Sequence, residues 1–230
     1  MVSPPLRSFR WPSSHRIIRT IYPPVDLFED IADPADWELL VAAEAKTNPR
    51  VLDAVGNLGL VPVARRVSGP TASLVMGAFT HASTDRPGRF SDGSYGVWYC
   101  GERFEVALAE TAYHFERFMG ATAEPPGEAD YRELVCAVHG EVADGLGPEV
   151  LAPDDWSAGQ ARGRDVRRGG GDGVIYPSVR FPAGMALALF WPDCIELPIV
   201  QAQQFRYGWD GHRMHRYLVH GSRAWTHFPG

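Results

Sequence analysis

Three side chains spaced between residues 89 and 110 are of the types that could bind and cleave a nucleotide. The planar guanidinium of Arg89 presents five donors that suit phosphate oxygens. Tyr99 follows ten residues later and offers an aromatic ring on which a flat ligand can stack. Glu110 comes eleven residues after Tyr99, and an ionised carboxylate there can hold a ribose hydroxyl. It can also stabilise the positive charge that develops on a sugar ring when a glycosidic bond breaks.

Each of these residues also has an ordinary structural interpretation. Arg89 lies in a turn, where it can be a surface arginine, and Tyr99 lies in an apolar segment, where it can be a core residue. On a helical wheel Glu110 falls nearly opposite the apolar stripe of its segment, beside His114 and Arg117, as in a solvated face. A helix between a sheet and a cleft can nevertheless turn its polar side to the cleft, so both interpretations stay open.

A fourth candidate is Ser178, which follows an apolar run over residues 173–176 and precedes Arg180. A serine at the end of a strand can bond a phosphate or an amide, or it can be a turn residue. No Gly-x-Ser-x-Gly sequence surrounds it, which argues against a serine hydrolase. His212 and His215 lack the glutamate and the spacing of a zinc-protease helix, so no metal site is expected.

The elements before these residues are read from their turn and helix signals. Residues 1–15 predict an irregular arm, and residues 15–19 predict a short strand. Asp33-Pro34 is a helix start signal and Asn48-Pro49 is a stop signal, so the sequence predicts a helix from Pro34 to Lys46. A second short helix is expected near residues 51–57.

The elements that carry the candidates are better marked. Residues 95–100 are aromatic and β-branched between two glycines, which predicts a strand. Residues 103–119 predict a helix because apolar side chains recur on one stripe. The stripe consists of Phe104, Leu108, Ala112, Phe115 and Met119.

The rest of the chain is rich in short apolar runs. Strands are predicted over residues 134–139, 173–176, 185–191 and 194–200. The glycine-rich residues 157–173 predict a mobile loop, either a flap over a ligand or an antitoxin or a plain surface loop. No element is assigned to residues 201–230. Because strands follow one another after a helical first third, the expected fold class is α+β.

Composition narrows the class of protein. The 230 residues carry a formal net charge of −6, and no long Lys/Arg-rich block is present, so direct binding to nucleic acid is not expected. The chain shows neither a signal peptide nor an apolar run long enough for a membrane span, which predicts a cytoplasmic protein. Three cysteines without CxxC spacing are expected to be reduced core residues, namely Cys100, Cys136 and Cys194.

Two segments resemble the signature regions of the RES domain, a family named for an arginine, a glutamate and a serine. They are GRFSDGSYGVWYCGERFEVALAE over residues 88–110 and GDGVIYPSVRFPAGMALALF over residues 171–190. The family pattern of Arg, Tyr, Glu and Ser falls on Arg89, Tyr99, Glu110 and Ser178, and its opening strand places an arginine at Arg16. The chain departs from many members at residues 87–91, Pro-Gly-Arg-Phe-Ser in place of Gly-Gly-Arg-Trp-Asn, and in the long stretch between Arg16 and Arg89.

The resemblance implies a fold and a biological setting. The fold would be a split β-sheet core with flanking helices, similar to that of ADP-ribosyltransferases. Residues 1–230 would form a single RES domain, with a helical extension of about residues 24–80 inserted before the core motif. RES proteins are the toxin halves of type II toxin–antitoxin pairs of the Res/Xre-like or ParT/ParS-like kind. An Xre-like or ParS-like antitoxin is therefore the expected partner.

The resemblance also implies a reaction. The chain would cleave the nicotinamide–ribose bond of NAD⁺, its substrate, deplete NAD⁺ and arrest growth. Two alternatives stay open: a mono-ADP-ribosyltransferase that modifies a cytoplasmic protein with NAD⁺, and a non-catalytic binding module. On the first interpretation Arg89 grips a phosphate, Tyr99 packs on nicotinamide, and Glu110 orients the ribose and stabilises the transition state. Ser178 with Arg180 would bond phosphate or the nicotinamide amide, and Arg16 would help to bind NAD⁺.

Overall fold

The computed structural model describes residues 5–29, 32–144 and 146–228, and its strands pair into one eight-stranded sheet in the order β1-β2-β5-β4-β3-β6-β7-β8. The long strands are β1 (Leu6–Arg19), β3 (Gly127–Ala143) and β6 (Val200–Trp209). The short strands are β2 (Trp98–Gly101), β4 (Gly173–Pro177), β5 (Met185–Leu189), β7 (Met214–Val219) and β8 (Thr226–His227). Five α-helices accompany them within the described residues, so the α+β class is confirmed.

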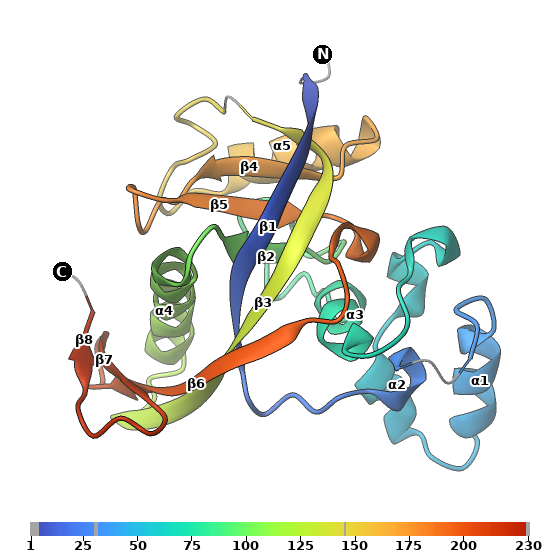
Figure 1. Ribbon diagram of the computed structural model, residues 1–230, viewed down its shortest axis with the longest axis horizontal. Coiled ribbons are helices and arrows are strands. Elements are labelled where there is room, and N and C mark those ends of the chain that lie inside the picture. The colour runs from blue at the N-terminus through green and yellow to red at the C-terminus, as the bar shows by residue number, and fades with distance from the viewer. Residues whose placement is uncertain (1–4, 30–31, 145, 229–230) are drawn as a thin grey trace.

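The sheet consists of two groups of strands that are only narrowly joined. β1, β3, β6, β7 and β8 pair antiparallel over long stretches, and β2, β5 and β4 form the second group. A single residue pair, His15 with Gly101, joins β1 to β2, and two pairs join β3 to β4 in parallel. Figure 1 shows β4 and β5 running across the direction of β1 and β3. This arrangement agrees with the expected split of the sheet.

The helix α4 (Phe104–Ala121) follows the predicted residues 103–119 within two positions at each end. Its buried residues Leu108, Ala112 and Phe115 pack in one cluster with Phe205 and Tyr207 of β6. The apolar stripe therefore faces the sheet, as helical periodicity requires, and the polar side that carries Glu110 is turned away from it.

Between β1 and β2 the chain forms short helices beside the sheet, on the right in Figure 1. They are η1 (Asp26–Phe28), α1 (Trp37–Glu44), α2 (Arg50–Val55), η2 (Leu58–Leu60), η3 (Val63–Arg65) and α3 (Ala72–Thr80). Trp37 and Met76 share one hydrophobic cluster with Leu134 and Leu187 of the sheet. The helix predicted from Pro34 begins instead at Trp37, because Asp33 caps a turn by accepting from the backbone of Ala35 at 2.8 Å and of Asp36 at 2.9 Å.

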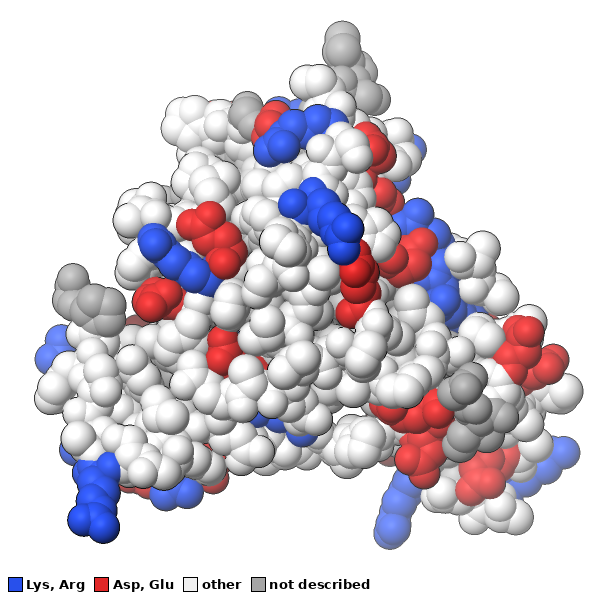
Figure 2. Space-filling view, viewed as in Figure 1, with Lys and Arg blue, Asp and Glu red and all other residues white. Residues whose placement is uncertain are grey.

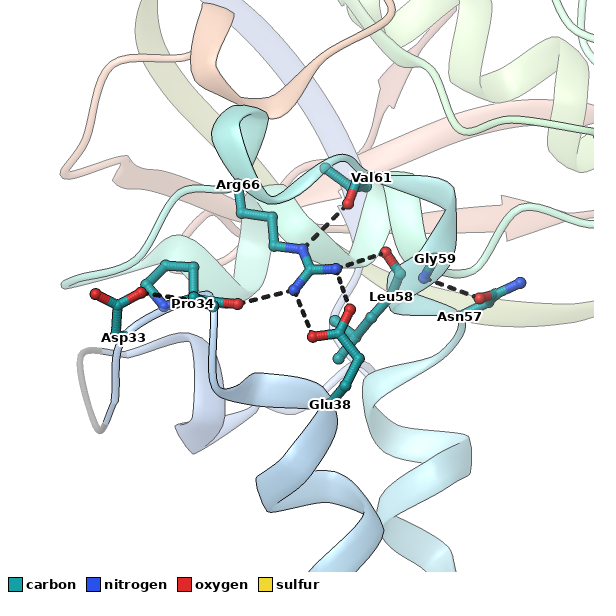
Figure 3. A network of polar contacts seen from close by, with 9 residues as sticks. Asp33, Pro34, Glu38, Asn57, Leu58, Gly59, Val61 and Arg66 are labelled. Carbon is teal, nitrogen blue, oxygen red and sulfur yellow. Dashed lines mark hydrogen bonds and ion pairs between the residues drawn. The ribbon is translucent and has the colours of Figure 1, made fainter.

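One buried arginine ties this helical segment together. Arg66 donates to the backbone carbonyls of Val61 at 3.1 Å, Leu58 at 3.2 Å and Pro34 at 2.8 Å. Both of its terminal nitrogens also meet the carboxylate of Glu38 in α1 (Figure 3). Figure 2 shows that Asp and Glu side chains gather at the lower right of the molecule, over α1 and α2.

Two predicted irregular segments are regular in the structure. Residues 157–168 form helix α5 (Ser157–Arg168) in place of the expected mobile loop. Its glycines serve close packing: a Cβ on Gly159 would lie 2.4 Å from the carbonyl oxygen of Arg89, and one on Gly163 would lie 2.1 Å from that of Phe90. The expected arm over residues 1–15 is also wrong for its described part, because β1 begins at Leu6, where Leu6 pairs with Ala143 of β3.

The C-terminal third contains one further correction. Residues 192–194 form the short helix η4 (Pro192–Cys194), and the strand predicted over residues 194–200 begins only at Val200, as β6. The unassigned residues after 200 form β6, β7 and β8. All three cysteines are free and buried, as expected. Among the described helices, none is long and apolar enough to cross a membrane.

Candidate active site

Arg89 is held by a tight turn at the start of the second strand group. The backbone N–H of Gly88 donates to the carbonyl of Ser91 at 2.8 Å, and the hydroxyl of Tyr95 donates to the carbonyl of Phe90 at 2.5 Å. The Arg89 side chain is only 7% exposed, and its Nη1 donates to the backbone carbonyls of Val150 at 3.2 Å and Ala152 at 2.7 Å. These bonds aim the guanidinium without neutralising its charge.

Tyr99 of β2 supports the same turn. Its hydroxyl accepts a 3.0 Å hydrogen bond from the backbone N–H of Phe90, and burial raises the pKa of Tyr99 well above its ordinary value. A Cβ at position 88 would lie 2.7 Å from that hydroxyl, which explains the glycine at Gly88. Tyr99 therefore fixes the position of Arg89 through the turn, in addition to offering its ring to a ligand.

Glu110 and Ser178 meet at the polar side of α4. The hydroxyl of Ser178 donates to Oε1 of Glu110 at 2.7 Å and accepts from the backbone N–H of Phe181 at 3.0 Å. Ser178 is 2% exposed, whereas Glu110 is half-buried. Since the single hydroxyl proton points at the carboxylate, Ser178 orients Glu110, and the other carboxylate oxygen accepts no hydrogen bond from the described residues.

Arg16 of β1 brings a second guanidinium to this place from the first strand group. Its Nη1 donates to the carbonyl of Tyr99 at 2.9 Å, and its guanidinium carbon lies 4.6 Å from the ring centroid of Trp98. Burial lowers the pKa of Arg16, yet an arginine keeps its charge in proteins. Within the described part of the chain, neither Arg16 nor Arg89 forms an ion pair with a carboxylate. Both are thus available to an anionic ligand.

Arg180 supplies a third guanidinium from the loop after β4. Its Nη2 donates to the carbonyl of Pro153 at 2.6 Å and lies 3.4 Å from the well-exposed carboxylate of Asp154. Its guanidinium carbon lies 3.4 Å from the ring centroid of Tyr113 in α4. Arg180 therefore rests against α4 at Tyr113, which follows Glu110 by three residues in the helix.

These side chains line one cavity of ≈ 220 Å³. Its wall includes five of the six residues expected from the sequence, namely Arg16, Arg89, Tyr99, Glu110 and Arg180. The sixth, Ser178, is not part of this wall, but its hydroxyl donates to Glu110, which is. The structure thus brings together residues from β1, the turn before β2, α4 and the loop after β4. A carboxylate faces three guanidinium groups there, which suits a ligand with both hydroxyl and phosphate groups.

The family model of the RES domain matches residues 63–210, well over half of the chain. The chain belongs to the RES-domain family. An uncharacterized protein, y4oC of Sinorhizobium fredii, is 28% identical over 205 residues, which cover 87% of this chain and 84% of that protein. A crystal structure of the MbcT–MbcA toxin–antitoxin complex of M. tuberculosis is also similar, with 19% identity and a TM-score of 0.36, over 50% of this chain and 67% of that one.

Several further residues of this RES domain line the cavity and were not singled out from the sequence. Tyr113, His114, Trp156 and Tyr176 belong to its wall. His114 follows Glu110 by four residues, so helical spacing was a usable signal for it. Its pKa is lowered mainly by the crowding of protein around the ring and further by three arginines, while Glu110 acts in the opposite direction.

Trp156 had no comparable signal in the sequence, because it reaches the cavity from the loop before α5. Its indole packs against the guanidinium of Arg117 at 4.6 Å and the ring of His114 at 5.6 Å. The described residues contain no group of three or more His, Cys, Asp or Glu side chains placed to hold a metal ion.

Proposed function

We propose that this RES domain cleaves the nicotinamide–ribose bond of NAD⁺ in the cavity around Glu110. The observation that carries the proposal is the Glu110 carboxylate, which accepts from Ser178 at 2.7 Å and lines the same cavity as Arg16 and Arg89. Membership of the RES family supports NAD⁺ as the substrate. The whole chain is proposed to act as a single domain, with the helices of residues 24–80 as an extension packed on the sheet.

The reaction needs charge stabilisation more than acid catalysis. The C1′–N bond breaks, and the electron pair leaves with nicotinamide, which departs as a neutral molecule. The positive charge passes to the ribose ring, where the Glu110 carboxylate stabilises it and holds a ribose hydroxyl. Water then adds to C1′ and releases a proton, which gives ADP-ribose. The Arg16 and Arg89 guanidinium groups bind the phosphate on the nicotinamide side, and the Tyr99 ring packs on nicotinamide.

We further propose the biological setting that family membership supports. The chain would act in the cytoplasm as the toxin of a toxin–antitoxin pair, where loss of NAD⁺ arrests growth until an Xre-like or ParS-like antitoxin binds. Co-expression with the reading frame next to its own tests this setting. We expect growth arrest from the chain alone and growth with both proteins. Arrest that the neighbouring protein never relieves would contradict the proposed partner.

The reaction is tested by the release of nicotinamide from NAD⁺ by purified protein, beside Glu110→Gln. The glutamine keeps the shape and can still accept the hydrogen bond from Ser178, but it removes the charge. We expect a loss of about 10²–10³ in rate for this variant, the range for one lost transition-state contact. A variant that cleaves NAD⁺ at the full rate would overturn the role of Glu110.

Two additional measurements in the same experiment identify the acceptor of ADP-ribose. A rate that depends on phosphate in the buffer indicates phosphorolysis instead of hydrolysis. Slow NAD⁺ loss together with labelling of a lysate protein by tagged NAD⁺ indicates a mono-ADP-ribosyltransferase. If the protein causes neither NAD⁺ loss nor labelling, the interpretation as a non-catalytic binding module remains.

A further inference from the structure

A second cavity of ≈ 610 Å³ opens beside the first one. It lies between α4 and the C-terminal strands β7 and β8, which Figure 1 shows next to the lower part of that helix. The two cavities share two wall residues, Tyr113 and Arg180. The stacked side chains of Arg180 and Tyr113 therefore form the boundary between the two cavities.

The sizes of the cavities indicate how a dinucleotide divides between them. Pockets for ligands of drug size measure about 300–1,000 Å³, whereas the cavity around Glu110 measures ≈ 220 Å³. The smaller cavity has room for the nicotinamide nucleoside, at whose ribose the bond breaks. The adenosine half of NAD⁺ must then lie outside it, and the second cavity is the adjoining space.

Arg180 stands where the pyrophosphate of such a ligand would cross. Its side chain is 20% exposed and rests on the ring of Tyr113, and its Nε atom is buried without a hydrogen-bond partner among the described residues. Nη2 is already bonded to the carbonyl of Pro153, whereas Nη1 makes no hydrogen bond among the described residues, so this end of the guanidinium can bind a phosphate group at the junction. The residue thus marks the boundary between the two halves of the ligand.

The wall of the second cavity suits a purine nucleoside. Ala112, Met214 and Phe228 line the cavity with apolar atoms, and the half-buried ring of Phe228 offers the largest apolar surface of the three to a flat ligand. Glu116 and Asp210 present carboxylates, which are acceptors for ribose hydroxyls. One oxygen of Glu116 already accepts from the backbone N–H of Met214 at 2.6 Å, which ties α4 to β7 across the cavity.

We propose that this second cavity is the subsite for the adenosine half of NAD⁺, with Arg180 at the pyrophosphate. The assignment rests on the NAD⁺ cleavage proposed above. Met214 and Phe228 lie beyond residue 210, where the match to the RES family model ends, so this chain's own C-terminal strands supply much of the subsite. The subsite selects for a dinucleotide over a mononucleotide.

The test compares NAD⁺ with nicotinamide mononucleotide, which has the same scissile bond but no adenosine. Ala109→Leu adds bulk to the second cavity at a position that does not itself line the first one. Ala121→Leu is the matched control, the same change at an exposed position of the same helix. We expect the ratio of kcat/KM for NAD⁺ to that for the mononucleotide to fall about tenfold in Ala109→Leu, equal to about 1.4 kcal/mol, and to stay constant in the control.

The other outcomes are decisive as well. An unchanged ratio in Ala109→Leu would overturn the subsite. Phe228→Ala, which removes a ring from the opposite wall, gives the same comparison if Ala109→Leu does not fold. If the wild type cleaves neither substrate, calorimetric binding of AMP separates the two proposals. AMP binding that Ala109→Leu weakens would support the subsite although the proposed reaction has failed, and no AMP binding would overturn both.

Discussion

Ser178 and Glu110 are 68 residues apart in the chain, and the serine hydroxyl donates to the carboxylate at 2.7 Å. The same hydroxyl accepts from the backbone of Phe181 at 3.0 Å, so its rotation is fixed from both sides. Ser178 is 2% exposed and its proton is already used. This geometry supports a role in which Ser178 orients the Glu110 carboxylate, and the expected bond from Ser178 to a phosphate or an amide stays a prediction.

Ser178→Ala tests this positioning role. A hydrogen bond to a charged group is worth about 1.5–3 kcal/mol, so we expect kcat to fall about 10–100-fold while the KM for NAD⁺ changes little. In a Glu110→Gln background the same substitution should cost much less, because the charge that it orients is already gone. Equal losses in both backgrounds would show that Ser178 acts independently of Glu110.

Gly163→Ala tests the contact between α5 and the arginine turn. The added Cβ would lie 2.1 Å from the carbonyl oxygen of Phe90, so α5 must move away from the turn that carries Arg89. We expect a lower melting temperature and a higher KM for NAD⁺. Gly120→Ala in α4 is the control: its Cβ meets nothing within 4 Å, and the change should stabilise the helix by about 0.5–1 kcal/mol. The interpretation fails if Gly163→Ala behaves like Gly120→Ala.

Arg66→Met tests how much the buried hydrogen bonds of Arg66 contribute to the stability of the helical segment. The substitution keeps most of the apolar stem but leaves the carbonyls of Val61 and Pro34 without this donor, whereas the carbonyl of Leu58 still accepts from the backbone N–H of Val61 at 3.0 Å. Each buried acceptor left unpaired costs about 1–3 kcal/mol, and we expect urea unfolding to show a loss of at least that size. Glu38→Gln should cost less, since the Glu38 side chain is half exposed. Equal losses for the two variants would assign the stability to the ion pair instead.

The pH dependence of stability should contain a contribution from His114. The folded-state pKa of His114 lies below its ordinary value of 6.5, so between the two values the unfolded chain binds more protons than the folded chain. Stability therefore rises with pH through that window and is lost as pH falls through it. We expect this contribution to the change of unfolding free energy with pH to be absent in His114→Asn. An NMR titration of the His114 ring with a midpoint above 6.5 would contradict the expectation.

The sequence by itself determined the elements whose signals are local. Helical spacing of Phe104, Leu108 and Phe115 placed α4 within two residues at each end, because burial of a stripe needs only the 3.6-residue period. The order of strands after helices indicated the α+β class. The spacing of Arg89, Tyr99 and Glu110 carried the resemblance to the RES family, which the family comparison confirms.

Only the tertiary structure decided between the alternative interpretations of residues whose local sequence pattern was ambiguous. Glu110 shows the pattern of a solvated face, and it became part of a cavity because the loops at Ala152 and Arg180 close over that side of α4. The glycines at positions 159 and 163 indicated a loop, yet they form a helix because the backbone of the arginine turn packs directly against them. Such contacts join segments far apart in the chain, and no local pattern encodes them.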